Sequence, residues 1–443
     1  MLKAKAQKYY KITAYGCQMN EHDAEVLAGQ LQEQNYLPTD DEATADLIIL
    51  ITCAVREHAE QRVYGKIGEL YRLKQENPNL ILAVGGCMSQ QMEVAKKMKQ
   101  RFPYLDIIFG THNLVNFPEL LRAASDGQET VLEILDKEGS LVEQLPRVRQ
   151  DGLKAWTTIM YGCNNFCTYC IVPYVRGRER SRQPASILAE IEDLVSRGYQ
   201  EVTLLGQNVN SYGKDLHDDY DFAALLRAVN DTGINRIRFM TSHPKDISPR
   251  LITAMAECEN VMEHLHLPVQ SGSSRILQSM NRRYTRERYL ELVREIRTAI
   301  PDIALTTDII VGFPGETEQD FEDTLSLMEA VRYDAAFTFA YSPRGGTPAA
   351  KMLEQVADAV SKERLQRLNE LQARISMERN QELISSEQQI LVEGPSKNDP
   401  SRLTGRTRGN KLVHFVGSEH LIGKIVRVRI TQAQTWNLLG ELI

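Results

Sequence analysis

The first 125 residues alternate short apolar runs with segments of helical periodicity. The apolar runs are 11–17, 46–53 and 81–87, and helix-like segments at 21–35 and 56–75 lie between them. This spacing predicts a parallel sheet covered by helices over residues 1–125. Residues 126–148 lose the pattern and gain charge, so we interpret them as a linker with some strand character.

The middle of the chain, 149–378, repeats the strand–helix rhythm. Helical segments such as 185–198 and 317–332 separate apolar runs of strand length. The six predicted strands are 155–162, 201–207, 236–242, 262–269, 303–312 and 335–342. Six sequential units predict a partial (βα)6 barrel, whose site would lie at the carboxyl ends of its strands.

Residues 361–384 have Leu365, Leu368, Leu371 and Ile375 near one face of a predicted helix. Beyond it, short β-rich runs broken by Gly, Pro, Asn and Ser predict a small antiparallel β-barrel over 379–443. The fold class is therefore α/β with a C-terminal β-module. From residue 383 onward eight Lys and Arg face five Asp and Glu, a net +3 that leaves −10 for the rest. A basic β-module on an acidic chain indicates a nucleic-acid substrate.

Bulk composition narrows the class of protein. A chain of 443 residues with a net charge of −7 is long enough for about three domains. It has no apolar run of membrane-span length, and its basic N-terminus lacks the apolar core of a secretory signal. Seven cysteines are too few for a disulfide scaffold, so we expect a cytoplasmic protein with reduced thiols.

Cys163, Cys167 and Cys170 follow the first predicted barrel strand. Three thiolates within eight residues can converge on one soft metal centre. A structural zinc site needs a fourth protein ligand, and no further Cys or His lies nearby. A 4Fe–4S cluster with three protein ligands leaves one iron free, and the spacing resembles that of the radical S-adenosylmethionine (SAM) enzymes. The alternatives are three structural thiols or a zinc knuckle.

Cys17, Cys53 and Cys87 each end one of the three N-terminal apolar runs. The carboxyl ends of parallel strands lie side by side, so these residues predict a second cluster. The alternative is three buried cysteines that act as small hydrophobic residues. Cys258 has no companion, and we expect an ordinary core residue there.

Four segments carry a family resemblance: 15–25, 52–70, 85–90 and 162–182. They resemble the radical SAM methylthiotransferases, and the last is most similar to the tRNA-2-methylthio-N6-dimethylallyladenosine synthases. The resemblance covers essentially the whole chain and implies an N-terminal methylthiotransferase domain, a radical SAM domain and a C-terminal TRAM domain. Ile51 departs from the family, which usually has Asn before Thr-Cys.

The resemblance implies two 4Fe–4S clusters. One, on Cys163, Cys167 and Cys170, would cleave SAM to a radical, and the other would supply sulfur. A methylthio group would then be inserted at C2 of N6-isopentenyladenosine beside the tRNA anticodon. An electron donor such as flavodoxin or ferredoxin is also implied. The alternatives are a sibling enzyme that modifies threonylcarbamoyladenosine or a ribosomal protein, and a zinc-stabilised RNA-binding protein without catalysis.

The ends of the predicted barrel strands supply candidate SAM contacts. Some of these residues are equally typical of ordinary βα turns or of structural hydrogen bonds. The candidates are Tyr169, Gly206, Gln207, Asn208, Ser242, His243, Gln270, Asp308, Gly312 and Pro314.

Two groups of basic residues are candidates for RNA contacts. Arg176, Arg178, Arg180 and Arg182 lie just past the cysteine loop, where they could also hold the SAM carboxylate. The second group, in the tail, is Arg402, Arg406, Arg408, Lys411, Arg427 and Arg429. The alternatives are a solvated charged face and a β-module with a polar exterior.

Overall fold

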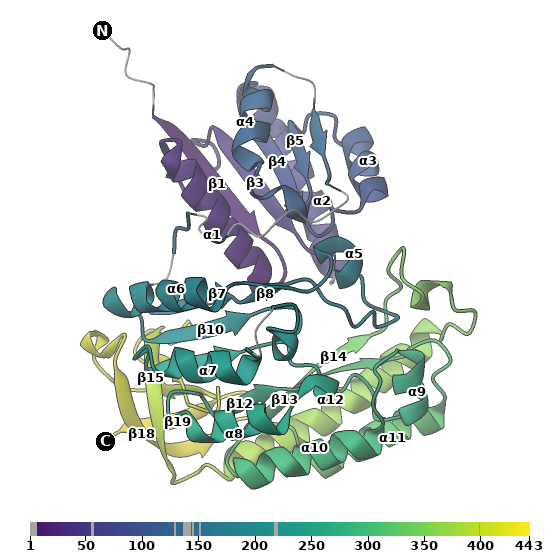
Figure 1. Cartoon of the computed structure of the whole chain (residues 1–443), viewed down its shortest axis with the longest axis vertical. Coiled ribbons are helices and arrows are strands. Elements are labelled where there is room, and N and C mark those ends of the chain that lie inside the picture. Colours follow the sequence, from purple (N-terminus) through teal and green to yellow (C-terminus); the bar gives the residue numbers. More distant parts are fainter. Residues whose placement is uncertain are drawn as a thin grey trace.

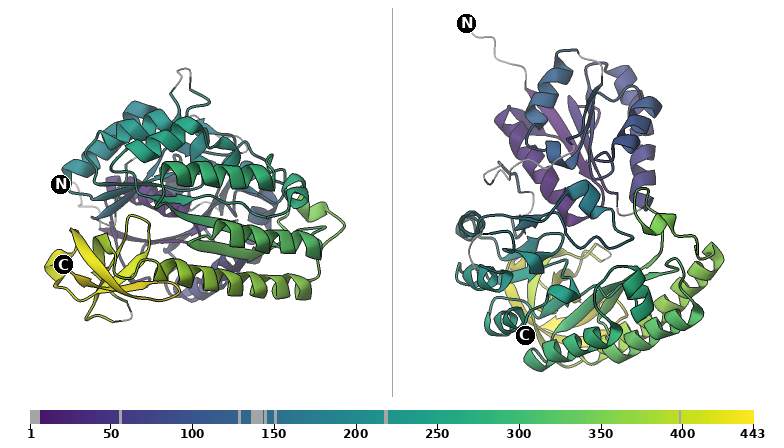
Figure 2. Two further views of the ribbon diagram at one scale, coloured as in Figure 1. Left: turned by 90° about the horizontal axis from the view of Figure 1, so that it is seen from below. Right: turned by 45° about the vertical axis from the view of Figure 1, so that its right-hand side comes forward.

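The computed structural model describes residues 7–54, 57–127, 130–135, 143, 146–149, 152–216, 220–397 and 399–443. The N-terminal unit lies against one side of the central βα unit, and the yellow C-terminal barrel lies at one end of the central unit (Figures 1 and 2). No helix in these ranges is long and apolar enough to cross a membrane.

The N-terminal unit is a six-stranded parallel sheet in the order β2-β1-β3-β4-β5-β6. In β3, Ile49 and Ile51 pack beneath α1 and α4, whereas Ile48 and Leu50 pack beneath α2 and α3, because successive side chains face opposite sides. The elements are β1 (Lys8–Ala14), α1 (Gln18–Glu33), β2 (Tyr36–Pro38), β3 (Leu47–Thr52), α2 (Glu57–Glu76), β4 (Ile81–Gly86), α3 (Met92–Arg101), β5 (Ile107–Phe109), α4 (Phe117–Ser125) and β6 (Val131–Glu133).

This sheet confirms the predicted parallel α/β fold and contains strands that the prediction lacked. β2, β5 and β6 have three residues each, too short to give a clear apolar period. β6 falls inside the predicted linker 126–148 and pairs with β5. The rest of that linker lies partly outside the described residues.

The central unit is the predicted partial barrel of six parallel strands. It consists of two three-stranded sheets that meet at a bridge between Ile237 and Val261. The strands are β7 (Lys154–Thr158), β10 (Glu201–Leu205), β11 (Arg236–Phe239), β12 (His264–His266), β13 (Ala304–Val311) and β14 (Ala335–Ala340). The helices are α5 (Val172–Arg176), α6 (Pro184–Ser196), α7 (Phe222–Asn230), α8 (Pro249–Glu257), α9 (Ser274–Ser279), α10 (Arg286–Ala299), α11 (Glu318–Val331) and α12 (Asp358–Gln381).

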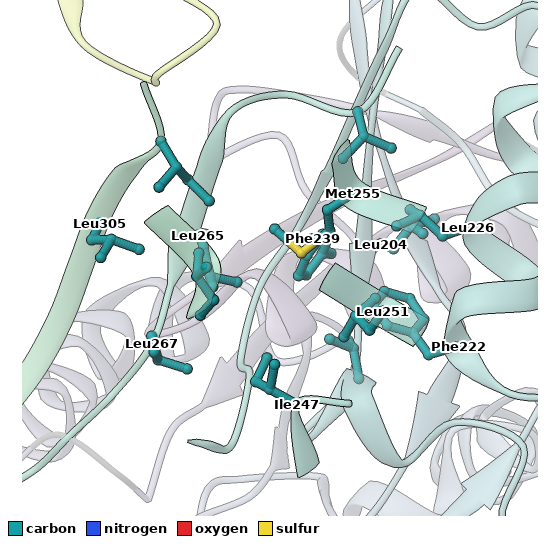
Figure 3. Packing of buried hydrophobic residues seen from close by; sticks show 14 of the residues in the cluster. Leu204, Phe222, Leu226, Phe239, Ile247, Leu251, Met255, Leu265, Leu267 and Leu305 are labelled. Atoms are coloured by element: carbon teal, nitrogen blue, oxygen red, sulfur yellow. The ribbon is translucent and has the colours of Figure 1, made fainter. Parts of the chain in front are cut away.

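The core of this unit lies between the strands and the helices outside them. Figure 3 shows Leu204 and Phe239 from the strands packed with Phe222 and Leu251 from α7 and α8. Burial of each such side chain contributes about 1.5–3 kcal/mol, which fixes the strand ends that carry the candidate site. Cys258 belongs to this core, as predicted.

The units also contain shorter elements. β8 (Met160–Tyr161) and β9 (Arg180–Ser181) form a small antiparallel pair that brackets the cysteine loop. The 3-10 helices are η1 (Thr111–Asn113), η2 (Val209–Ser211), η3 (Pro244–Asp246), η4 (Ala349–Lys351) and η5 (Glu419–Leu421).

The C-terminal unit is a closed five-stranded barrel, as predicted, in the order β15-β16-β17-β19-β18. Its pairings are antiparallel except for β17 with β19, which is parallel. Buried Arg236 and Arg238 on β11 fasten it by donating to main-chain carbonyls of Gln389 and residues 406–408. The strands are β15 (Glu387–Pro395), β16 (Leu403–Arg406), β17 (Leu412–Phe415), β18 (Ile425–Ala433) and β19 (Leu438–Leu442).

Candidate functional site

Cys17, Cys53 and Cys87 follow β1, β3 and β4, which are neighbours in the sheet. Cys17 caps α1, and the Cys87 N–H donates to the carbonyl of Thr52 (3.0 Å). A Cβ on Gly16 would lie 2.8 Å from Cys53 Sγ, so the chain at Cys17 passes directly over Cys53. The fold therefore gathers three cysteines from distant parts of the sequence at one sheet edge.

Burial raises the pKa of Cys87 to about 12 and also raises the pKa of Cys17. Arg176 opposes this effect, because its Nε donates to Cys87 Sγ at 3.3 Å. Cys53 lies close enough for its charge to raise the pKa of Cys17, and Cys17 and Cys53 together raise the pKa of Cys87. A thiol in such a place ionises when it binds a metal centre.

The second triad lies on one loop between β8 and α5. Gly162, at φ +78°, lets the loop start close to the backbone of Arg178. Asn165 Nδ2 donates to Cys163 Sγ (3.5 Å), and Phe166 adopts a left-handed φ of 48°. Burial raises the pKa of Cys163 to about 11 and that of Cys170 to about 12, and the nearby Cys167 thiol adds to both shifts.

Both triads consist of thiols, the donors that hold zinc ions and iron–sulfur clusters. Bonds of thiolate to one zinc ion are about 2.3 Å long and require closely packed donors. Among the described residues no group of three His, Cys, Asp or Glu has that geometry. Cysteine thiolates are the ligands of iron–sulfur clusters, so the donor chemistry of each triad suits such a cluster.

The segment after α9 packs on the second triad. Arg282 Nη1 donates to Cys167 Sγ (3.4 Å), and Asn281 donates to the carbonyls of Asn165 and Phe166. Tyr169 packs beside this segment, where burial raises its pKa. Its predicted contact with SAM stays a prediction.

The predicted SAM residues after β10 and β11 lie at one rim. Asn208 joins the two turns by donating to Asp246 (2.8 Å) and accepting from the His243 N–H (3.2 Å). Gln207 Oε1 accepts from the Gly162 N–H, next to the second triad. Gly206 stands so close to Met160 that a Cβ would clash.

Three buried polar atoms of the predicted SAM residues at this rim have no partner among the described residues. They are Gln207 Nε2, Ser242 Oγ and His243 Nε2. Burial lowers the pKa of His243 far below its usual range, so its imidazole is neutral. Unpaired buried polar atoms are costly, and a polar ligand such as SAM would satisfy them.

The other predicted SAM residues lie across the barrel. Gln270 adopts a φ of 73°, and its backbone bridges to Ile309. Asp308 faces His266 Nε2 at 3.5 Å. Gly312, at φ +70°, and Pro314 form the turn after β13, where the Gly312 N–H donates to Glu316 (2.8 Å).

The arginines past the cysteine loop divide into two pairs. Arg176 is 5% exposed and binds Asp23, and Arg182 is 2% exposed and binds Glu143 and Glu190. Both guanidinium groups are thus engaged in ion pairs inside the protein, and their predicted contact with RNA phosphates or SAM stays a prediction. Arg178 is exposed and stacks on Phe166, and Arg180 is half-buried.

The basic tail residues also divide. Arg408 pairs with Glu263 and Lys411 with Asp334, so both hold the barrel against the central unit. Arg406 is half-buried and faces Glu393. Arg427 and Arg429 on β18 are exposed, and Arg402 is at the surface beside Asp399.

The structure adds Asn20, Asp23 and Arg282, which sequence reasoning missed. Asn20 and Asp23 accept from Arg176 at 2.9 and 2.7 Å. Asp23 lies with Cys17 in the segment 15–25 that carries the family resemblance, and this nearness could have marked it as a candidate site residue. Arg282 is one of several arginines in 282–288, and nothing in the sequence separates it from the others.

Comparison with known proteins gives three family matches. The Radical SAM superfamily matches residues 157–328, the Uncharacterized protein family UPF0004 matches 9–110, and the TRAM domain matches 381–443.

Several curated relatives match nearly the whole chain. The tRNA-2-methylthio-N(6)-dimethylallyladenosine synthase of Thermoanaerobacter sp. is 57% identical over 98% of this chain and 93% of that protein. The protein of the same name from Acetivibrio thermocellus is 57% identical over 100% of this chain and 92% of that protein. The one from Clostridium perfringens is 56% identical over 99% of this chain and 98% of that protein.

Two solved structures are similar to this chain in their fold alone. The radical S-adenosylmethionine methyltransferase TsrM from Kitasatospora setae has a TM-score of 0.57 at 16% identity, over 78% of this chain and 77% of that one. The cobalamin-dependent S-adenosylmethionine radical enzyme OxsB has a TM-score of 0.53 at 14% identity, over 83% and 56%.

Proposed function

Because the chain belongs to the tRNA-2-methylthio-N6-dimethylallyladenosine synthase family, we propose that it inserts a methylthio group at C2 of N6-isopentenyladenosine in tRNA. It is a radical SAM methylthiotransferase. The observation that carries the proposal is the presence of two separate cysteine triads in a chain that is 57% identical to these synthases over nearly its full length.

Each triad would hold one 4Fe–4S cluster, with SAM on the cluster of Cys163, Cys167 and Cys170. When bound, these cofactors supply a radical able to remove hydrogen from a C–H bond without useful acidity, and the sulfur that replaces it. The surrounding residues would position the cysteines of both triads, exclude water from them and orient the bound ligands. Gln207, Ser242 and His243 would satisfy their free polar atoms on SAM.

The inner wall of the barrel supports the isopentenyl substrate over its threonylcarbamoyl counterpart. Phe337 and Phe339 on β14 are 52% and 41% exposed and pair in register with Asp308 and Ile310 of β13. Phe337 contacts the ring of His266 at 5.8 Å, which places this row on the inner face. Aromatic rings beside a carboxylate suit an apolar prenyl group and disfavour the carboxylate of threonine.

The partners follow from the same proposal. The anticodon stem-loop of tRNA would contact Arg402, Arg427 and Arg429 through phosphate groups, with Arg178 and Arg180 nearer the site. A one-electron donor such as flavodoxin or ferredoxin would reduce the SAM-binding cluster. Thiols stay reduced in the cytoplasm, which supports the proposal that the enzyme acts there.

The test is expression of the chain in a bacterial strain that makes N6-isopentenyladenosine but cannot methylthiolate it. Mass spectrometry of digested tRNA should then find 2-methylthio-N6-isopentenyladenosine. It should find no methylthio form of threonylcarbamoyladenosine that depends on the chain. The variant Cys163→Ala/Cys167→Ala/Cys170→Ala should yield none. Modification of threonylcarbamoyladenosine or of a ribosomal protein would instead identify a sibling enzyme, and zinc in place of iron would favour a non-catalytic RNA-binding protein.

A further inference from the structure

Each triad has one buried arginine that donates to a cysteine sulfur. Arg176 Nε lies 3.3 Å from Cys87 Sγ, and Arg282 Nη1 lies 3.4 Å from Cys167 Sγ. Both side chains are 5% exposed. A buried guanidinium remains charged, so each triad has a fixed positive charge beside it.

The two arginines differ in what balances their charge. Arg176 forms an ion pair with Asp23, whose side chain is 2% exposed. Arg282 has neutral oxygen partners, the Tyr284 hydroxyl at 3.1 Å and the carbonyl of Pro268 at 2.8 Å. Within the described ranges, Arg282 forms no ion pair with a carboxylate. Among those residues, no carboxylate is paired with the positive charge at the second triad.

The backbone holds Arg282 in place at some cost. Asn281 and Arg283, on either side of it, have left-handed φ angles of 58° and 62°. The Thr168 N–H donates to the carbonyl of Met280 at 3.1 Å, which joins this turn to the cysteine loop. Left-handed non-glycine residues are strained and persist where the surroundings require them.

We propose that Arg282 is a positioning residue that raises the reduction potential of the cluster on Cys163, Cys167 and Cys170. This inference rests on the cluster assignment of the proposed function. Reduction adds one electron, supplied by the one-electron donor, without a proton. A buried positive charge and a hydrogen bond to sulfur stabilise that added negative charge. The Arg176–Asp23 pair gives the other cluster the hydrogen bond with little net charge.

The test is an anaerobic redox titration followed by electron paramagnetic resonance. The chain carries Cys17→Ala, Cys53→Ala and Cys87→Ala, so that only the second triad can bind a cluster. In this background Arg282→Gln should reduce the reduction equilibrium constant about tenfold, a fall of about 59 mV in midpoint potential. Arg282→Lys, which keeps the charge, should recover most of the fall, and Arg176→Gln should cause none.

Three results would overturn the proposal. They are an unchanged potential in Arg282→Gln with full iron, an equal fall in Arg282→Lys, and failure of both variants to bind iron, which would make Arg282 purely structural. The titration contains no tRNA, so a different RNA substrate would leave its result intact. Absence of iron in the background chain itself would instead refute the cluster assignment.

Discussion

The two triads present similar chemistry on different kinds of scaffold. Cys163, Cys167 and Cys170 lie on one loop, whose shape depends on local turns and on the segment that contains Arg282. Cys17, Cys53 and Cys87 come from three strands and depend on the pairing of β1, β3 and β4. Their arginine, Arg176, belongs to the other unit. The N-terminal triad thus has its arginine beside it only when the two units are docked.

The largest expected effect is that replacing the cysteines of one triad abolishes SAM cleavage, whereas replacing those of the other abolishes only formation of the methylthio product. Cys163→Ala/Cys167→Ala/Cys170→Ala should abolish reductive cleavage of SAM, because no cluster remains to bind it. Cys17→Ala/Cys53→Ala/Cys87→Ala should retain cleavage and lose only the methylthio product. Chromatography of 5′-deoxyadenosine formed with dithionite measures this. Loss of cleavage in both variants would show that the triads are not separable.

The docking of the units gives the next effect. Glu190 on α6 binds Arg149 (2.6 Å) and Arg182 (2.8 Å), and Arg149 also binds Glu25 on α1 (2.7 Å). Burial raises the pKa of Glu190. The ion pairs with Arg182, Arg147 and Arg149 outweigh this effect and lower that pKa to about 2. Compared with an unfolded value of about 4.3, this contributes about 3 kcal/mol of stability.

The sign of this contribution sets its pH dependence. Because the folded pKa is depressed, the stability is present above about pH 4.3 and is lost as the pH falls toward 2. In the metal-free chain, Glu190→Gln should lower the free energy of unfolding at pH 7 by about 3 kcal/mol and flatten its acid dependence. Denaturant titrations measure both. Exposed Glu192→Gln on the same helix is the control, and an equal effect there would remove Glu190 from the interface.

A matched pair of glycines then compares the triad on one loop with the triad assembled from three strands. Gly16 (φ +114°) and Gly162 (φ +78°) each precede the first cysteine of a triad. A Cβ would meet Cys53 at 2.4 Å in the first case and the Arg178 carbonyl in the second. Gly16→Ala and Gly162→Ala should each destabilise by about 1–3 kcal/mol and lower iron at their own triad only.

The control for this pair is Gly127→Ala, which has a φ of +81° but nothing within 4 Å of a Cβ. It should leave the iron content unchanged. Loss of iron from both triads in Gly16→Ala would show that the radical SAM loop depends on the N-terminal sheet.

The smallest effect concerns RNA binding at the C-terminal barrel. Exposed Arg427→Ala and Arg429→Ala should each weaken tRNA binding modestly and reduce the salt dependence, by up to about 0.9 in the slope of log K against log salt. Filter binding at several salt concentrations measures this. Arg408→Ala should act instead through stability, because Arg408 pairs with Glu263. An unchanged slope in both β18 variants would place the RNA elsewhere.

The sequence predicted the elements whose apolar period is long. The β13 and β14 strands and the positions of Cys17, Cys53 and Cys87 at strand ends follow from such runs. A three-residue strand such as β6 is too short to show a period, so the sequence predicts a linker there.

Charge in the sequence does not reveal burial. Arg176 and Arg178 stand two positions apart, yet the first is buried against Asp23 and the second is exposed. The difference arises from the docking of α5 on the N-terminal unit, which no local pattern encodes. The same holds for Arg282, whose role depends on a turn that meets the cysteine loop from 115 residues away.

The measurement that tests the central claim most directly is iron and acid-labile sulfide per chain after anaerobic reconstitution. Two four-iron clusters predict about eight irons in the unaltered chain and about four in each triple cysteine variant. Four irons in the unaltered chain, with none left in Cys163→Ala/Cys167→Ala/Cys170→Ala, would contradict the second cluster and remove the source of sulfur from the proposed reaction.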